Sequence, residues 1–234
     1  ASPDACRLVL QHFPKPSELA PRVWTPREFL FGSTEECVHA CDCICASLKI
    51  TNPTANNTTK RKILVLVNPF GGSGAGWSKW REAEPVFDLV SNETEVEVIE
   101  TKSIGHAFRI GHDLKLEEVD AVVCVSGDGV MNEVLNGLLS RTDVSLPLTN
   151  ITFGLIPAGT GNGFGRTFHC LDPVSAAFNI CKGRTHSLDL IEVVFESKRY
   201  FCFLSFNWAL ISDVDFESET YRWLGSARLT VAAV

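Results

Sequence analysis

The sequence has 234 residues, of which 45% are hydrophobic and 21% are charged. This balance is typical of a globular chain that is long enough for one large domain, or for one domain plus part of another. A formal net charge of -7 without a local basic stripe excludes nucleic acid as the expected partner. No stretch reaches the ~18 apolar residues that a membrane-spanning helix needs, so any membrane contact should be peripheral.

The first 50 residues are predicted to form a small α+β region of their own. Short strands are expected at residues 7–13 and 22–31. The sequence Ser-Thr-Glu-Glu at 33–36 resembles a capping box and predicts a helix that continues to about residue 48. Residues 51–61 are polar and lack periodicity, which is typical of a linker.

Cysteines are crowded within this first region. Four of the nine in the chain lie at Cys37, Cys41, Cys43 and Cys45. Their spacing is not that of a zinc site, and three of them recur every four residues, as small hydrophobic side chains do on one helix face. They are therefore predicted to be buried free thiols in a reducing cytoplasm, with metal binding or redox chemistry as the alternative.

Residues 62–186 are predicted to form a second, larger domain of alternating strands and helices. We expect strands at 63–67, 95–100, 121–125 and 151–156, and helices at 77–90, 105–114 and 130–139. The runs at 63–67 and 121–125 are continuously apolar, as in strands buried on both faces. This alternation predicts a parallel sheet, and ligands of such sheets bind at the carboxyl ends of the strands.

Three glycine-rich loops follow predicted strands, at residues 68–76, 126–129 and 156–165. Glycines at these positions let backbone N–H groups approach an anion closely. The first loop is not a Walker A motif, because Trp77 and Ser78 stand where Lys and Ser or Thr are required. The loops do not match the dinucleotide-binding fingerprint either. Together they therefore predict a phosphate-binding site of another type.

The second loop places Asp128 between Gly127 and Gly129 at the end of a buried strand. The two glycines remove side-chain bulk, so a phosphate chain and an acceptor hydroxyl could both come close. Asp128 could then accept a proton from that hydroxyl, beside a helix start that favours anions. The alternative interpretation is an Asp that only caps a turn.

From residue 187 onward a different pattern begins. Residues 188–195 and 200–206 are predicted strands, and residues 217–232 a helix, so 187–234 is expected to open a β-rich domain that the chain leaves unfinished. The segment 212–228 has an acidic half that could meet a cation or hydroxyls and a basic half that could hold phosphate. Its alternative interpretation is an exposed, ion-paired helix.

Three motifs in this order resemble the diacylglycerol-kinase catalytic domain family. They are N-P-x-G-G-x-G at 68–74, S-G-D-G-x-x-x-E-V-x-N-G-L at 126–138 and P-A-G-T-G-N at 157–162. The resemblance implies an α/β nucleotide-binding domain followed by a β-sandwich lipid-binding domain. It also implies transfer of the γ-phosphate of ATP, with Mg²⁺, to a lipid hydroxyl. Phe70 and Ser73 depart from the family, whose members often have basic residues there.

Within this family, the segment 213–228 is similar to the sphingosine-kinase pattern D-V-D-x-x-S-E-x-x-R-x-L-G-x-x-R. The similarity implies that Asp128 is the general base and that Asp215 binds the amino-alcohol head of a sphingoid base. It implies that Arg222 and Arg228 hold the ATP phosphates. The other residues implied in the nucleotide site are Asn68, Thr101, Ser126, Gly127, Gly129, Glu133, Gly159 and Thr160.

Ceramide kinase and diacylglycerol kinase remain alternatives, as does a non-catalytic module that binds lipid or nucleotide. Asp215 favours a cationic lipid, because a carboxylate gains charge-assisted hydrogen bonds from an ammonium group. The resemblance further implies a cytoplasmic protein that associates peripherally with membranes. We expect the chain to be incomplete at its C-terminus, without metal ligands that can be named, and the 234-residue chain alone to be inactive.

Overall fold

The computed structural model falls into two compact units, residues 1–60 and 61–234, which are considered separately. It describes residues 6–12, 25–31, 35, 60–72, 74–146, 148, 151–183, 185–207, 209–218, 220–221 and 227–232. In the first unit, β1 (Cys6–His12) pairs antiparallel with β2 (Thr25–Phe31), close to the predicted positions. The predicted helix at 33–48, apart from Glu35, and the four crowded cysteines lie outside the described residues.

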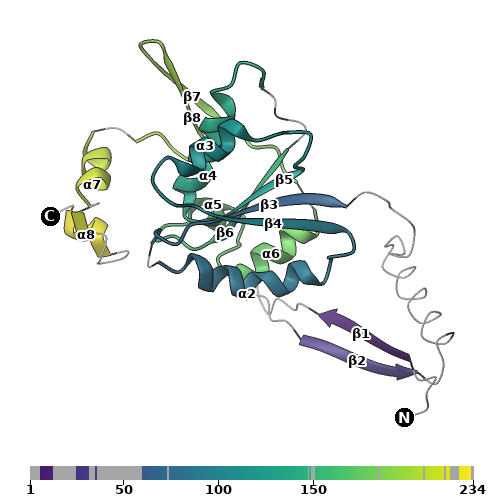
Figure 1. Ribbon diagram of the computed structural model, residues 1–234. Coiled ribbons are helices and arrows are strands. Elements are labelled where there is room, and N and C mark those ends of the chain that lie inside the picture. The colour runs from purple at the N-terminus through teal and green to yellow at the C-terminus, as the bar shows by residue number, and fades with distance from the viewer. Residues whose placement is uncertain are drawn as a thin grey trace. The chain divides into compact units, whose positions relative to one another are not determined.

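The second unit is built on a four-stranded parallel sheet, as its alternating pattern predicted (Figure 1). The strands are β3 (Arg61–Val67), β4 (Thr94–Glu100), β5 (Ala121–Ser126) and β6 (Thr152–Pro157), in the order β4-β3-β5-β6. All six residues of β5 are buried, because the strand lies inside the sheet and carries helices on its faces. At the sheet edge, β4 is less covered: its Val96 and Ile99 are half-buried, whereas Val98 and its three glutamates are exposed.

Helices cover both faces of this sheet (Figure 1). They are α2 (Gly76–Asp88), α3 (His106–Asp113), α4 (Asp128–Leu139), α5 (Gly163–Thr167) and α6 (Pro173–Cys181). The helices α3 and α4 pack together on one side, and α2 packs with α6 on the other. Within the part of the chain that the structure describes, no helix is long and apolar enough to span a membrane.

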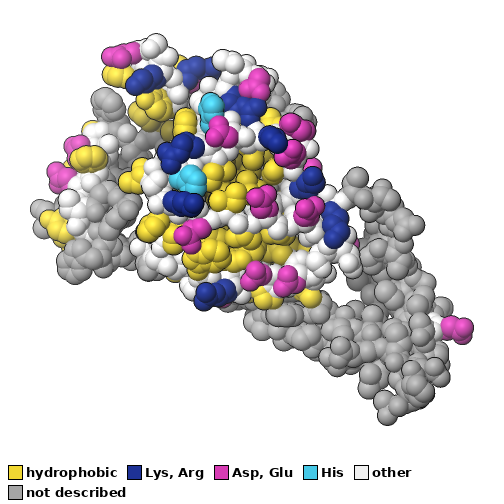
Figure 2. All heavy atoms as spheres, viewed as in Figure 1, with side chains coloured by type: hydrophobic (Ala, Val, Ile, Leu, Met, Phe, Trp, Pro, Cys, Tyr) yellow, Lys and Arg dark blue, Asp and Glu magenta, His cyan; other side chains and the backbone are white. Residues whose placement is uncertain are grey.

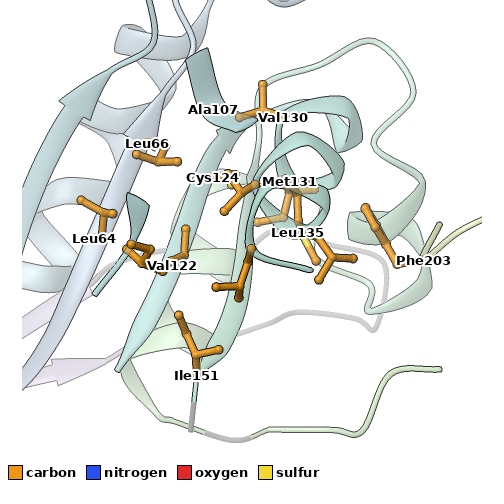
Figure 3. Close-up of a cluster of buried hydrophobic side chains, with 14 of the residues drawn as sticks. Leu64, Leu66, Ala107, Val122, Cys124, Val130, Met131, Leu135, Ile151 and Phe203 are labelled. Carbon is orange, nitrogen blue, oxygen red and sulfur yellow. The ribbon is translucent and has the colours of Figure 1, made fainter. Parts of the chain in front are cut away.

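The main hydrophobic core lies between the sheet and α4 (Figure 3). Leu66 and Cys124 from the sheet meet Met131 and Leu135 from α4. Cys124 has no exposed surface, and burial raises the pKa of its thiol to about 12, with a further rise caused by the carboxylate of Glu133. The helix that begins with Asp128 is therefore fixed firmly to the strand that precedes it.

The residues after 187 correct the predicted strand lengths. The strands β7 (Ile191–Phe195) and β8 (Lys198–Cys202) form the expected antiparallel hairpin, but both are shorter than predicted. The strand β8 ends at Cys202, opposite the first residue of β7, and Phe203 just beyond it is buried in the core at 8% exposed.

The helix predicted over 217–232 is tested in part. The structure describes α7 (Leu210–Ser218) and α8 (Arg228–Ala232) at the two ends of this span, and residues 219 and 222–226 lie outside the described residues. The face of α7 that is shielded from solvent carries Val214 and Ser218, which are spaced one helical turn apart.

A surface hollow of about 440 Å³ lies between β4 and α3. On this face, hydrophobic side chains are flanked by charges of both signs (Figure 2). It is lined by Leu64, Glu97, Ile99, His106, Arg109, Ile110, Asp113, Leu114, Lys115, Glu118 and Val119. None of these residues belongs to the glycine-rich loops, so the hollow is separate from the site described next.

Candidate active site

The segments after β3, β4, β5 and β6 all lie at the carboxyl edge of the sheet, because the four strands are parallel. Hydrogen bonds continue the strand pairing into these segments. The N–H of Asn68 donates to the Val125 carbonyl at 3.1 Å, and the N–H of Ala158 donates to the Ser126 carbonyl at 2.9 Å. These bonds hold the glycine-rich loops in register with one another.

The three loops touch backbone to backbone. A Cβ atom at Gly159 would lie 2.4 Å from the Cα of Gly127, which joins the third loop to the second. A Cβ atom at Gly72 would lie 2.9 Å from the carbonyl oxygen of Ala158, which joins the first loop to the third. Gly72 also has a φ of +58°, a conformation that side chains disfavour. Only glycine allows the loops to meet at this distance.

The third loop is closed by a side chain that the sequence reading did not single out. The Oδ1 atom of Asn162 accepts a hydrogen bond from the N–H of Gly159 at 2.9 Å, and its Nδ2 donates to the Gly159 carbonyl at 2.8 Å. Asn162 has a φ of 49° and immediately precedes α5. Asn tolerates this left-handed conformation better than most residues. Its position directly before Gly163 was the feature of the sequence that could have indicated this role.

Asp128 occupies the first turn of α4, directly after β5 and Gly127. One carboxylate oxygen accepts a hydrogen bond from the N–H of Gly163 at 2.8 Å, and the other accepts one from the N–H of Phe164 at 3.0 Å. These donors are the free N–H groups at the start of α5. Asp128 thus does cap a helix, although not its own.

The two hydrogen bonds leave the Asp128 carboxylate able to accept further hydrogen bonds or a proton. The side chain is half-buried, and each carboxylate oxygen can accept more than one hydrogen bond. Because Gly163 and Phe164 fix the orientation of the carboxylate, the remaining lone pairs have defined directions. The arrangement suits acceptance of a proton from a hydroxyl group placed beside the loops.

Aromatic side chains pack beside the groups that hold Asp128. The ring of Phe164 meets Phe203 edge to face at 5.6 Å and lies 4.8 Å from Phe168. The side chain of Leu204 lies so close to Gly163 that a Cβ atom there would be 3.2 Å from it. The carboxylate therefore has glycine-rich backbone and apolar side chains among its near neighbours.

The structure places the other described candidates of the nucleotide site at the same edge. Asn68 accepts a hydrogen bond at Oδ1 from the N–H of Phe70 at 2.9 Å, which shapes the first loop. Thr101 follows β4, is 4% exposed and donates its N–H to the Val67 carbonyl at 2.9 Å. The hydroxyl of Ser126, which is fully buried, donates to the carbonyl of Gly127 at 2.8 Å.

Three further candidates differ in exposure. Glu133 lies on α4 and accepts a hydrogen bond from the N–H of Gly105 at 3.1 Å, which ties α4 to the segment after β4. Thr160 is exposed on the third loop. A Cβ atom at Gly129 would meet nothing within 4 Å, so open space lies beside the first turn of α4. An exposed hydroxyl and open space at this edge leave room for a ligand.

Of the remaining predicted residues, Asp215 lies in α7 and Arg228 begins α8, but their side chains, like all of Arg222, lie outside the described residues. Their roles stay predictions.

The donor set present is compatible with Mg²⁺ held chiefly by a nucleotide. The described ranges contain no group of three His, Cys, Asp or Glu residues that could hold a metal ion. Mg²⁺ in kinases is usually held by one or two carboxylates together with substrate phosphates. The exposed Thr160 and the open space beside Gly129 leave room for a nucleotide that carries the ion, which fits this mode of binding.

The fold and the site together define a class of protein: an α/β domain with glycine-rich loops and a carboxylate held at the carboxyl edge of its sheet. The model of the diacylglycerol kinase catalytic domain matches residues 62–193, which is more than half of the chain. The chain therefore belongs to the diacylglycerol kinase catalytic domain family.

Its relatives are named as kinases of sphingoid bases. Sphingosine kinase 1 of Arabidopsis thaliana is 38% identical over 73% of this chain and 36% of that protein. Human sphingosine kinase 2 is 38% identical over 74% of this chain and 28% of that protein. Sphingoid long chain base kinase 4 of Schizosaccharomyces pombe is 32% identical over 94% of this chain and 46% of that protein. The chain thus spans less than half the length of these relatives.

Proposed function

We propose that the protein is a lipid kinase that transfers the γ-phosphate of ATP to the primary hydroxyl of sphingosine or a related sphingoid base. The observation that carries the proposal is the carboxylate of Asp128, which two backbone N–H groups hold where the glycine-rich loops meet. Family membership supports the reaction class, and the names of the relatives support the acceptor.

In the proposed reaction, the hydroxyl oxygen of the lipid attacks the γ-phosphorus as the bond to the β–γ bridging oxygen breaks. Asp128 accepts the hydroxyl proton, and ADP leaves with the electron pair of the broken bond. The backbone N–H groups of the glycine-rich loops hold the phosphates, and the Thr160 hydroxyl can add a further donor. Mg²⁺, when bound, supplies positive charge to the phosphate oxygens. Catalysis then depends mainly on positioning and on electrostatic stabilisation.

The choice of a sphingoid base depends on its amino group. Asp215, within the pattern at 213–228, would pair with the ammonium, which ceramide and diacylglycerol lack. Arg222 and Arg228 of the same pattern would hold the ATP phosphates. Because the acceptor lipid resides in membranes, we also propose that the protein works in the cytoplasm and associates peripherally with a membrane surface.

The test uses the longest available form of the protein and ATP labelled at the γ-phosphate. Sphingosine, ceramide and diacylglycerol are offered in parallel to the wild type and to Asp128→Asn. Removing a general base typically lowers the rate about 10²–10⁴-fold. The matched control is Asp120→Asn, because Asp120 also accepts one backbone N–H bond, from Lys62 at 2.7 Å, but lies before β5 instead of after it.

Each result has a defined meaning. Label on sphingosine that disappears in Asp128→Asn, but persists in Asp120→Asn, supports the acceptor and the base together. Asn can accept only one of the two N–H bonds of α5, so ATP binding by Asp128→Asn is measured alongside. Label on ceramide or diacylglycerol would keep the lipid kinase but overturn the role of Asp215. ATP binding without label on any lipid would favour a binding module.

A further inference from the structure

Asn136 joins the helix that begins with Asp128 to the hairpin that follows the nucleotide-binding half. Its Nδ2 donates to the carbonyl of Phe201 at 2.8 Å, and its Oδ1 accepts from the N–H of Phe201 at 2.8 Å. The second Nδ2 hydrogen is directed to the carbonyl of Asn132 at 2.9 Å. The side-chain amide thus pairs with one residue of β8 as a neighbouring strand would, across 65 positions of sequence.

The same part of the chain has a second attachment next to Asp128. Phe203, two residues after Phe201, packs on the ring of Phe164, whose own N–H binds the Asp128 carboxylate. Figure 3 shows Phe203 reaching the cluster formed by α4. The segment 201–203 is therefore held at one point by α4 and at another by α5. Both points belong to helices that contact Asp128 directly.

Burial alone would not fix this arrangement. Phe201 is 4% exposed and Phe203 is 8% exposed, so hydrophobic packing already favours contact with α4. Packing is non-directional, however, whereas the amide accepts only a partner that presents N–H and C=O side by side. A slip of β8 by one residue would turn the other edge of the strand toward Asn136 and break both bonds. The amide therefore selects the register.

We propose that Asn136 is a positioning residue for the lipid acceptor. By locking β8 in register on α4, it fixes where the chain beyond β8 enters the lipid-binding side, relative to the carboxylate of Asp128. This inference rests on the proposed function. It assigns a role to a residue of the motif at 126–138 that neither phosphate binding nor proton transfer uses.

The experiment compares Asn136→Asp and Asn136→Leu with the wild type, in the longest available form of the protein. The Asp variant loses both donors, and the Leu variant loses every hydrogen bond while it keeps a similar size. The matched control is Asn179→Asp, because Asn179 on α6 also uses its Nδ2, toward the Cys170 sulfur at 2.8 Å, but touches neither α4 nor β8 through that bond. KM and kcat are measured separately for ATP and lipid, together with the fraction of phosphate transferred to water.

We expect kcat/KM for the lipid to fall about tenfold or more in both variants, since misplacement of about 1 Å costs up to ~10²-fold. KM for ATP should stay within about twofold, and the fraction of phosphate transferred to water should rise. Hydrogen exchange of the Phe201 amide should become faster, because Leu removes its acceptor and the carboxylate of Asp repels the Phe201 carbonyl to which Asn136 donates. The control should show none of these changes.

The opposite results are equally specific. If kcat falls only in proportion to the folded fraction, with both KM values and the water fraction unchanged, Asn136 is structural and the inference is wrong. If the Asp and Leu variants fail to fold, Asn136→Gln takes their place, because it keeps the amide N–H and C=O groups but displaces them by one methylene. The same comparison of KM, kcat and the water fraction then decides. If the wild type labels no lipid, the proposed function is overturned and this inference with it. If the wild type labels lipid and the variants have the same kinetic constants, only the inference is overturned.

Discussion

Substitution of Gly159 by Ala tests the contact that joins the second and third loops. The new Cβ atom would lie 2.4 Å from the Cα and 2.9 Å from the nitrogen of Gly127. Ordinary contacts between carbon atoms are about 3.5–4.0 Å, so the two loops would have to separate by about 1 Å. Both clashing atoms are backbone, and the adjacent Ala158–Ser126 bond of 2.9 Å resists that movement.

Overpacking of this kind typically costs about 1–3 kcal/mol. At about 2–4 °C per kcal/mol for a chain of this size, a cost of about 2 kcal/mol lowers Tm by about 4–8 °C. The assay is thermal unfolding followed by circular dichroism, combined with urea titration to obtain the free energy of unfolding. ATP affinity of Gly159→Ala should fall as well, because the second and third loops would no longer meet.

The control is Gly161→Ala on the same loop. A Cβ atom at Gly161 would meet nothing within 4 Å, and its φ is not in the left-handed region, so its unfolding should resemble that of the wild type. If Gly159→Ala and Gly161→Ala have the same Tm, the backbone contact between the loops does not determine stability. The explanation for the glycines would then be refuted.

Two further predictions concern titratable groups. Because burial raises the pKa of Cys124 to about 12, its thiol stays neutral at pH 8, and mass spectrometry should find it alkylated only after unfolding; alkylation of native protein at the unfolded rate would contradict this. The Arg141 guanidinium holds the pKa of Asp143 below its ordinary 3.8, so Asp143 adds stability above that pH and loses it as pH falls through the lowered pKa. Urea unfolding of Asp143→Asn should therefore differ from wild type at neutral pH and converge with it in acid; a difference that persists in acid would refute the ion pair as the cause.

The parallel sheet could be predicted because its signals are local. The runs at 63–67 and 121–125 contain only apolar residues over strand length, and such runs suit strands with covered faces. The observed strands and helices of this region begin and end within a few residues of the predicted ones. The order β4-β3-β5-β6 was not predicted, because it depends on which strands pair across long stretches of sequence.

The strand boundaries after residue 187 have a tertiary cause. Residues 200–206 are apolar enough to continue a strand, yet β8 ends at Cys202, opposite Ile191, where its partner β7 begins. The end of a strand depends on the partner that pairs with it, and the local sequence pattern does not report that partner.

For the candidate site, the sequence indicated that three glycine-rich loops would meet at one edge, since each follows a parallel strand. It could not indicate what holds Asp128, because the Gly163 and Phe164 donors lie 35 and 36 positions away. The pairing of Asn136 with Phe201 was hidden for the same reason. Spacing within a motif reports neighbours on one element, whereas these bonds join different elements.

The hydrogen-bond partners of Asp128 also show that its two interpretations, as a capping residue and as a general base, are compatible. The two N–H bonds that make the carboxylate a cap for α5 are the bonds that orient its remaining lone pairs. They also couple the base to the third loop, because α5 directly follows Asn162, which closes that loop on Gly159. Movement of the third loop is therefore expected to displace the Asp128 carboxylate as well. In the proposed reaction, this coupling would keep the proton acceptor aligned with the phosphate that the loop would hold.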